Sequence, residues 1–370
     1  MDKVKVVRKG DKDGHNMIIR FRLPSGLEIY GLPTRNFFES QWDLGPTWNY
    51  LVLADKPFLV DVGRYGQGRN LVNMIESVGI KGEEIKSIII SHGHEDHDGG
   101  LKEVIKDTKS VVRAHPIYKR LIKKYSEKAP QSRVKNFPAK CWNCFMPDSF
   151  YKKYCVGYHE DLQELDVEVI DGGEDTVGTD IHTYHLPGHS PDCLAVLLGD
   201  EAILVGDIVL PDLTPWPTSE NTFVELAEVL APDYTDAQAI FGLRCYIESL
   251  KKLGEKARQQ PELLVLPAHR IYFGGQWNGI ILEERVQELL RHHVDRCGAI
   301  LDILNGGSKT AVEIAEGHFE PSLLTGSGRI MGIREIISHC ELLIHSGDVV
   351  SDGNGKFEAT GSSHFEGEIL

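Results

Sequence analysis

Apolar residues recur along the chain with two different spacings, and each spacing predicts one kind of secondary structure. Helical spacing occurs in Gly68–Val78 and Gly100–Lys106, and a longer helical stretch covers Glu225–Leu230 and Asp236–Lys256. Short apolar or alternating runs are typical of β-strands, and the clearest are Met17–Arg22, Leu27–Tyr30, Asn49–Ala54, Phe58–Val62, Ile88–Ser91, Val167–Ile170, Ala202–Val205 and Leu263–Leu266. Because the two kinds of element alternate, residues 1–280 are predicted to form an α/β domain.

The pattern changes at about Leu282, where a long helix begins that ends at Asn305-Gly306-Gly307. Thr310 and Glu313 form a capping-box pair that opens a second, short helix. A third helix is predicted over residues 330–344, and a hairpin over residues 348–359. Three helices and a hairpin predict a small winged-helix-like domain over residues 281–370.

Composition limits the class of protein. With 370 residues, 41% of them hydrophobic and 26% charged, the chain has a globular composition and enough length for one large and one small domain. The opening segment MDKVKVVRKGDKDG has charges where a signal peptide is apolar, and no run reaches the roughly 18 apolar residues of a membrane helix. Seven unevenly spaced cysteines do not form a secreted disulfide framework. We therefore expect a cytoplasmic protein with reduced thiols and no membrane partner.

The charge distribution bears on possible partners. A formal net charge of −15 repels nucleic acid at long range, so any anionic substrate needs a local basic patch. One basic strip exists, for which a solvated helix face is the favoured interpretation, and a site for a nucleotide-bearing thioester or an RNA track are the alternatives. Its members are Lys119, Arg120, Lys123, Lys124, Lys128, Arg133, Lys135 and Lys140.

The C-terminal unit, by contrast, is acidic. From Gly306 onwards four basic residues face ten acidic ones, a net charge of −6. Phosphate contacts dominate nucleic-acid affinity, so this balance argues against RNA binding by the unit. We expect it to pack against the catalytic domain, to form a homodimer or to cover the substrate.

Four potential metal ligands lie within six residues directly after an apolar strand. Ile88–Ser91 leads into His92-Gly93-His94-Glu95-Asp96-His97, which precedes Gly99-Gly100 and a helix. Side chains two residues apart on an extended backbone point to the same side, so His92 and His94 can bind one ion. The chain then turns, and Asp96 and His97 can face a second ion. Imidazole nitrogens with carboxylates suit zinc best, with iron or manganese possible.

Three more potential ligands each follow an apolar strand. His189 comes after Pro187-Gly188, Asp207 ends the run Ala202–Gly206, and His269 comes after Pro267-Ala268. Singly, each also fits a turn or capping residue. Their shared placement at strand ends favours a common site.

Taken together, these motifs resemble those of the metallo-β-lactamase-fold hydrolases, over about residues 45–270. Asn49-Tyr50-Leu51 and Asp61-Val62-Gly63 are similar to the opening hairpin and the D-x-G signature of that family. The resemblance implies a four-layer αββα sandwich with the metal ions at the strand ends along one edge. It implies two Zn²⁺ ions, with catalytic roles for Asp96 and Asp207, and the following ligands: His92, His94 and His189 on the first ion, Asp96, His97 and His269 on the second, and Asp207 between them.

Two dications that share a water lower its pKa, from about 15.7 to about 7 in the best single-zinc cases. The hydroxide formed in this way can attack a carbonyl or phosphoryl centre, so no protein nucleophile is required. Two positions depart from the family pattern, at Ser190-Pro191-Asp192 and at Arg270, and neither removes a ligand. Pairing with a nearby acid is the favoured interpretation of Arg270, and recognition of an anionic substrate group is the alternative.

The C-terminal unit, together with Arg285–Leu290, His292-His293 and Arg296, resembles the extension of one hydrolase subgroup that includes an endoribonuclease branch. The chain also resembles the glyoxalase II branch. Cys141, Cys144, Cys155 and His159 are interpreted as unrelated residues of an insertion, with a small structural zinc site or a redox pair as the alternatives. Trp216, Tyr272 and Phe273 follow ligands closely and line either an apolar pocket or the core.

The favoured function is hydrolysis of a thioester, such as an acyl-CoA, or of a related carboxylic ester by a dinuclear centre, on a small anionic molecule. The alternatives are RNA phosphodiester cleavage and persulfide oxygenation at a single iron. Large nucleases of the family insert a whole domain between the positions of Asp207 and His269, and here that interval is only a helical excursion. The ribonuclease interpretation therefore ranks second.

Overall fold

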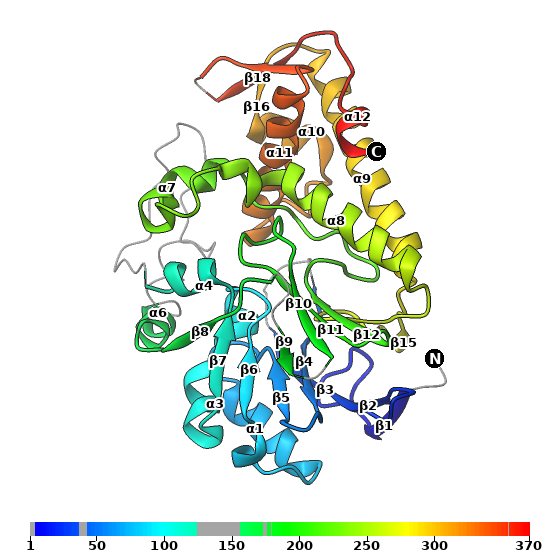
Figure 1. Cartoon of the computed structure of the whole chain (residues 1–370). Helices are drawn as coiled ribbons and strands as arrows, with labels where there is room; N and C mark the ends of the chain where they lie inside the picture. The colour runs from blue at the N-terminus through cyan, green and yellow to red at the C-terminus, as the bar shows by residue number, and fades with distance from the viewer. Residues whose placement is uncertain (1–3, 37–42, 124–155, 173–175, 179, 354) are drawn as a thin grey trace.

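The computed structural model of the protein describes residues 4–36, 43–123, 156–172, 176–178, 180–353 and 355–370, and its core is a pair of facing β-sheets (Figure 1). The first sheet has eight strands in sequence order, antiparallel from β1 to β5 and parallel from β5 to β8. These strands are β1 Val4–Arg8, β2 Ile18–Arg22, β3 Glu28–Thr34, β4 Thr47–Val52, β5 Phe58–Val60, β6 Ser87–Ile89, β7 Val111–Ala114 and β8 Val167–Val169.

The second sheet has five strands in the order β13-β12-β11-β10-β9, and only the β12–β13 pair is parallel. Its strands are β9 Thr176–Gly178, β10 Ile181–His185, β11 Leu194–Leu198, β12 Ala202–Gly206 and β13 Leu264–Pro267. A short hairpin, β14 Tyr272–Phe273 and β15 Gln276–Trp277, follows β13.

Helices cover the outer faces of both sheets (Figure 1). Among the described residues up to 280, the helices are α1 Gly68–Ser77, η1 Gly82–Glu84, α2 Glu95–Asp98, α3 Leu101–Thr108, α4 Pro116–Leu121, α6 Val156–Gln163, α7 Asn221–Leu230, η3 Ala237–Ala239 and α8 Gly242–Gln259. Within the described ranges, no helix combines the length and the apolar character needed to cross a membrane.

The alternation of side chains along the strands explains the four layers. In β4, Leu51 packs with the helices α1 and α3, whereas Tyr50 and Val52 pack between the two sheets. In β11, Leu197 faces α8 and Val196 faces the first sheet. Successive side chains of a strand point to opposite faces, so strands covered on both faces are apolar at nearly every position. The four-layer αββα sandwich predicted from the sequence is confirmed.

The C-terminal part adds further helices and a small sheet of three strands in the order β16-β18-β17. Its elements are α9 Leu282–Leu304, β16 Lys309–Thr310, α10 Ala311–His318, α11 Ser327–His345, β17 Val349–Ser351, β18 Lys356–Ala359 and α12 Glu366–Ile369. The capping box is confirmed, because Glu313 N donates to Thr310 Oγ1 over 3.2 Å and Thr310 N donates to Glu313 Oε2 over 2.7 Å. The boundary at residue 281 and the winged-helix class stay predictions.

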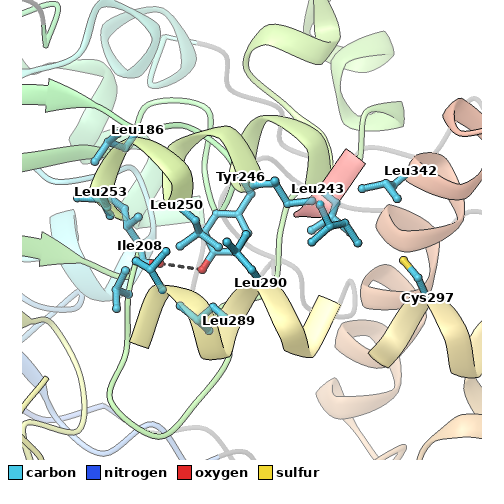
Figure 2. Packing of buried hydrophobic residues seen from close by; sticks show 14 of the residues in the cluster. Leu186, Ile208, Leu243, Tyr246, Leu250, Leu253, Leu289, Leu290, Cys297 and Leu342 are labelled. Carbon is cyan, nitrogen blue, oxygen red and sulfur yellow. Dashed lines mark hydrogen bonds between the residues drawn. The ribbon is translucent and has the colours of Figure 1, made fainter. Parts of the chain in front are cut away.

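The C-terminal helices share one hydrophobic core with the outer face of the second sheet. Leu250 of α8 and Leu289 of α9 are both fully buried in this core (Figure 2). Tyr246 of α8 lies in the same cluster, and its hydroxyl donates to the carbonyl oxygen of Ile208 over 2.7 Å. Burial of this apolar surface stabilises the attachment of the C-terminal part to the sandwich.

Two features of the helical excursion differ from the prediction. The helix expected from Glu225 begins at Asn221, and the helix expected from Asp236 begins only at Gly242. Asp236 instead accepts a hydrogen bond from Gln238 N over 3.0 Å and opens the 3-10 turn η3. Phe241 then has an extended backbone, with a buried ring, so the helix cannot include it.

Candidate metal centre

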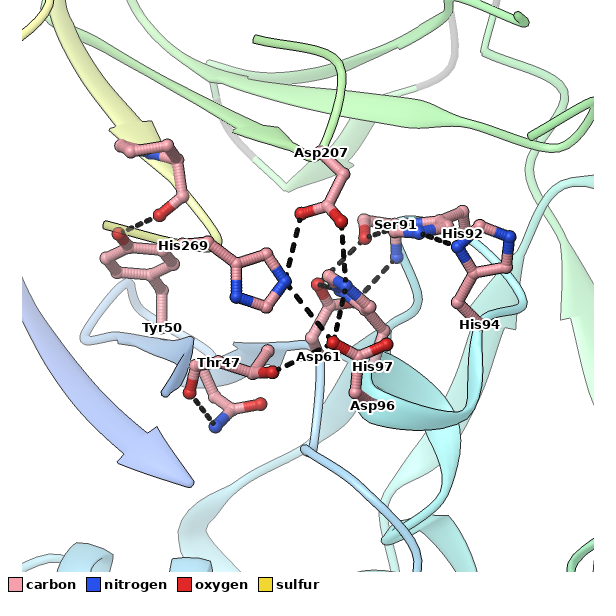
Figure 3. Close-up of polar contacts among 12 residues, drawn as sticks. Thr47, Tyr50, Asp61, Ser91, His92, His94, Asp96, His97, Asp207 and His269 are labelled. Carbon is pink, nitrogen blue, oxygen red and sulfur yellow. Dashed lines mark hydrogen bonds and ion pairs between the residues drawn. The ribbon is translucent and has the colours of Figure 1, made fainter. Parts of the chain in front are cut away.

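The seven predicted ligands converge at one edge of the sandwich, where strands of both sheets end. Figure 3 shows the ligands other than His189. His92 and His94 follow β6, and Asp96 and His97 belong to the short helix α2. The other three follow strands of the second sheet: His189 after β10, Asp207 after β12 and His269 after β13. Each of the seven residues is buried, with at most 9% of its surface exposed.

Three histidines form the first half of the site. His92 Nε2 lies 3.0 Å from His94 Nδ1, and His189 Nε2 lies 3.1 Å from the same His94 atom. The three nitrogens can therefore hold one ion.

The second half contains Asp96, His97 and His269. Asp96 Oδ2 lies 3.2 Å from His269 Nε2 and 3.6 Å from His97 Nε2. One atom from each of the three residues lies within 4.8 Å of the others, so this group can also hold an ion.

Asp207 lies between the two halves. Its Oδ2 is 3.6 Å from His189 Nε2 in the first half and 3.5 Å from His97 Nε2 in the second. Its Oδ1 is 3.4 Å from His269 Nε2. A single carboxylate thus reaches both groups, as a residue shared by two ions would.

The hydrogen-bonding state of these atoms fits metal ligands. Within the described residues, His97 Nε2, His269 Nε2 and Asp207 Oδ1 are buried and have no aligned hydrogen-bond partner, although facing charges lie 3.2 to 3.6 Å away. Buried polar groups are normally paired, and unpaired ones need an explanation such as an ion. A nitrogen-rich set with two carboxylates is the donor chemistry of zinc and of other divalent transition metals.

Electrostatics differ between the two halves. Burial lowers the pKa of His92 far below its ordinary value and, with the neighbouring His189, lowers that of His94 to about 3. Burial also lowers the pKa of His189. These three rings are therefore neutral near pH 7 and have lone pairs to offer a cation.

In the second half, the two histidine rings have raised pKa values. Burial opposes the charge on His97, but Asp96, Asp207 and Asp61 together raise its pKa well above the ordinary value. Burial likewise opposes the charge on His269, and Asp207 and Asp96 raise its pKa to about 9. Against the effect of burial, these histidines hold the pKa of Asp96 and of Asp207 below the ordinary range. The second half thus binds positive charge even without metal.

Further hydrogen bonds fix the orientation of the ligands. Asp61 Oδ2 is 2.9 Å from His97 Nδ1, and Asp61 also accepts the N–H and the hydroxyl of Ser91, both over 2.8 Å. Asn36 Nδ2 and Thr47 Oγ1 donate to Asp96 Oδ2 over 2.9 and 3.1 Å. Partners of this kind set the ring tautomer and the aim of a ligand.

These orienting roles were not predicted from the sequence. The D-x-G signature is the one signal that points to Asp61, whose backbone has a φ of +62°. Thr47 lies two residues before the Asn49-Tyr50-Leu51 segment, but a lone hydroxyl gives no signal of its partner. Asn36 follows β3 and has no motif around it.

Asp192, at one of the two departures from the family pattern, supports the first motif. Its Oδ2 accepts a hydrogen bond from Gly93 N, between His92 and His94, over 2.8 Å, and its Oδ1 accepts one from the Ser190 hydroxyl. The residue is fully buried, and burial raises its pKa to about 6. Asp192 therefore orients the loop that carries the first two ligands.

Arg270, the other departure, pairs with an acid as favoured. Its Nε donates to Asp212 Oδ1 over 3.0 Å, and its Nη1 donates to the carbonyl oxygen of Asp43 over 3.2 Å. Its guanidinium carbon lies 3.8 Å from the ring centre of Phe273. The Arg270 guanidinium group is thus paired with groups of the protein itself.

The basic strip lies mostly outside the described residues, which include only its first three members. Lys119 Nζ donates to Val167 O over 2.7 Å, and Lys123 Nζ donates to Leu165 O over the same distance. Arg120 donates to Ala231 O over 3.0 Å and pairs with Asp233. These three residues join neighbouring segments. Cys141, Cys144 and Cys155 also lie outside the described residues, whereas His159 is buried in α6.

A further histidine and carboxylate group lies in the C-terminal part, formed by His292, His293 and Glu335. Arg296 interacts with two of its members: Nη1 donates to Glu335 Oε1 over 3.3 Å, and Nη2 lies 3.2 Å from His292 Nε2. The guanidinium group supplies the positive charge here, so this group differs from the metal centre.

Comparison with known proteins agrees with this geometry. The family model of the metallo-beta-lactamase superfamily matches residues 42–269. The chain therefore belongs to the metallo-beta-lactamase superfamily, and it is a metal-dependent hydrolase with His and Asp clusters that can bind divalent ions. No match was found among curated proteins.

Two solved structures are similar over nearly the whole chain. A metallo-beta-lactamase family protein from Thermus thermophilus is 20% identical with a TM-score of 0.63, covering 90% of this chain and 98% of that one. A beta-lactamase domain protein from Burkholderia ambifaria is 16% identical with a TM-score of 0.64, covering 97% of this chain and 100% of that one. At these identities the likeness shows the fold alone.

Proposed function

We propose that the protein is a dinuclear hydrolase, with zinc as its metal, that cleaves a thioester or a related carboxylic ester of a small molecule. His92, His94 and His189 would hold the first ion, Asp96, His97 and His269 the second, and Asp207 both. The observation that carries the proposal is the reach of Asp207, whose Oδ2 lies 3.6 Å from His189 Nε2 and 3.5 Å from His97 Nε2.

The bound ions would supply water of near-neutral pKa and polarise the substrate oxygen. Asp61 and Asp192 would help to position the ions. Asp61 fixes His97, and Asp192 fixes the loop between His92 and His94. Ser91 and Ser190 are the hydroxyls next to ligands in the sequence. Both are buried and bonded to aspartates, Asp61 and Asp192, which argues against a serine nucleophile.

The surroundings favour an acyl substrate over RNA. Trp216 is partly exposed, and its ring stacks on His94 with 6.1 Å between centroids and 8° between planes, so it offers an apolar wall beside the first group. Arg270 is held by Asp212, and Lys119, Arg120 and Lys123 are used in contacts within the chain. Among the described residues, these observations give little support to phosphate binding, which needs available cations.

A substrate panel tests the proposal. Zinc-loaded protein would be assayed with an acyl-CoA thioester, an activated carboxylic ester, a single-stranded RNA and a persulfide, the last by oxygen uptake. We expect turnover of the thioester or ester, lost in Asp207→Ala and kept in Glu358→Ala, which changes an exposed acid of β18. RNA cleavage or oxygen uptake that depends on Asp207, without ester turnover, would overturn the proposed substrate class.

A further inference from the structure

A short segment, residues 216–221, connects the metal centre to the start of α7. At its first residue, Trp216, the carbonyl oxygen lies 3.0 Å from His189 Nδ1, and the ring stacks on His94. Thr218 N and Oγ1 both donate to the carbonyl oxygen of Gly188, over 2.6 and 2.8 Å. The first half of the segment therefore contacts two of the three histidines of the first group, His94 and His189.

The second half of the segment is tied to the C-terminal part through Glu341 of α11. Ser219 Oγ donates to Glu341 Oε1 over 2.8 Å, and Glu220 N donates to Oε2 over 2.8 Å. Asn221 donates to Oε1 from both its backbone N, over 3.1 Å, and its side-chain amide, over 2.6 Å. One carboxylate from about 120 residues further along the chain thus accepts four hydrogen bonds.

The position of these donors explains why a carboxylate suits the site. Glu220 and Asn221 lie at the beginning of α7, where backbone N–H groups have no partner within the helix. Glu220 is the N-cap residue, and its own side chain makes no capping hydrogen bond. The helix dipole favours a carboxylate at a helix N-terminus, and here the carboxyl group comes from another part of the chain, where burial raises its pKa to about 7.

We propose that Glu341 is a positioning residue for the metal centre: by fixing segment 216–221, it orients Trp216 and, through the Trp216 carbonyl, His189. The C-terminal part then contributes to the first metal group although none of its described residues is a ligand there. The proposed role of Glu341 requires that His189 binds a metal ion, but it requires no particular substrate. This inference therefore rests only on the metal-binding part of the proposed function.

The test compares Glu341→Ala, Glu341→Gln and the exposed control Glu358→Ala, all in the full-length chain. One readout is acrylamide quenching of Trp216, taken as the difference between each protein and its Trp216→Phe counterpart. The other is zinc affinity, measured by competition with a chromophoric chelator. In Glu341→Ala we expect stronger quenching of Trp216 and a loss of zinc affinity for the first group of about tenfold, as for other residues that orient ligands.

Glu341→Gln keeps the size of the side chain and one oxygen acceptor, but it turns an amide donor towards Glu220 N or Asn221 N. We expect an intermediate effect in both readouts. If Glu341→Ala fails to fold, a double-mutant cycle of Glu341→Gln with Asn221→Ala replaces it. The two substitutions should then be non-additive in zinc affinity, because they act on the same contact.

A purely structural cap would give a different result. If the Glu341 variants lose thermal stability but keep wild-type quenching of Trp216 and wild-type zinc affinity, the proposal is wrong. Additive effects in the double-mutant cycle would also contradict it. Failure of the wild-type protein to hydrolyse any thioester or ester would instead contradict the proposed substrate, and it would leave both of these readouts intact.

Discussion

His97 Nδ1 lies 2.9 Å from Asp61 Oδ2, so a candidate ligand on α2 is oriented by an acid that directly follows β5. The same carboxylate accepts both Ser91 donors, and the Ser91 hydroxyl lies 3.0 Å from His92 Nδ1. Asp61 therefore connects one histidine from each half of the centre. Burial lowers the pKa of His97, and Asp96 and Asp207 raise it by larger amounts than Asp61 does. The charge of Asp61 adds to their effect.

Asp61→Asn should weaken the second metal group more than the first. The amide loses the charge that supports His97 and can accept fewer of the three hydrogen bonds. We expect zinc affinity of the second group to fall by about 10- to 100-fold, the usual effect of removing a partner of a histidine ligand. Chelator competition measures both affinities, with the exposed Asp55→Asn as a control. If Asp61→Asn binds zinc at both groups with wild-type affinity, Asp61 does not orient the ligands.

Metal binding should release protons from the second half of the centre. In the metal-free protein at pH 7, His97 and His269 are protonated, because facing carboxylates outweigh burial and raise their pKa values, that of His269 to about 9. Filling both groups must then displace about two protons per chain. Affinity for the second ion should rise as pH rises through about 9, the pKa of His269, whereas affinity for the first should change little around pH 7, because the pKa values of His92, His94 and His189 are all lowered.

Isothermal titration calorimetry in buffers with different ionisation enthalpies measures this release. The slope of the observed enthalpy against buffer enthalpy gives the number of protons. A slope of zero at pH 7 would mean that both histidines are already neutral, and the electrostatic description of the second half would be wrong.

The sequence singled out the candidate ligands because they follow strong local signals, and the structure brings their side chains together. His92 to His97 form one compact motif, and Asp207 and His269 follow the apolar, largely buried strands β12 and β13. The signal for His189 is weaker, because only Ile181 and Thr183 of β10 are buried. The strands β1, β7 and β11 were not predicted. Charged residues interrupt the apolar pattern of β1, and Arg113 interrupts that of the short β7. The run Leu194–Leu198 of β11 is uniformly apolar, the same pattern as the predicted run Ala202–Val205, so the sequence did carry a signal for this strand.

Contacts between distant segments were beyond the reach of sequence patterns. Nothing near Glu341 indicates that it binds the beginning of α7, and nothing near Asn36 indicates that it donates to Asp96. Such pairs depend on how layers pack, which local spacing does not encode. The position of Arg270 beside a ligand was visible, but its pairing with Asp212 could only be ranked against substrate binding.

The C-terminal helices and the sandwich should unfold together, because they share one core. Leu289→Ala removes a fully buried side chain between α9 and α8 and should destabilise the protein by about 2 to 5 kcal/mol, the usual cost of such a cavity. Urea unfolding followed by far-UV circular dichroism and by tryptophan fluorescence measures it. Val350→Ala, at a side chain that is 52% exposed, is the control.

Coincident transitions with both probes, shifted together in Leu289→Ala, are the expected result. Two separate transitions, with only one of them shifted, would show instead that the C-terminal part unfolds independently of the metal-binding sandwich.

The number of metal ions per chain tests the central claim most directly. Protein expressed in zinc-supplemented medium and purified without chelators would be analysed by inductively coupled plasma mass spectrometry against the concentration of the chain. Seven ligand residues around two groups predict two equivalents of metal, chiefly zinc, and a loss of metal in Asp207→Ala. A reproducible single equivalent of iron, unaffected by changes at Asp96 or His269, would contradict the dinuclear centre.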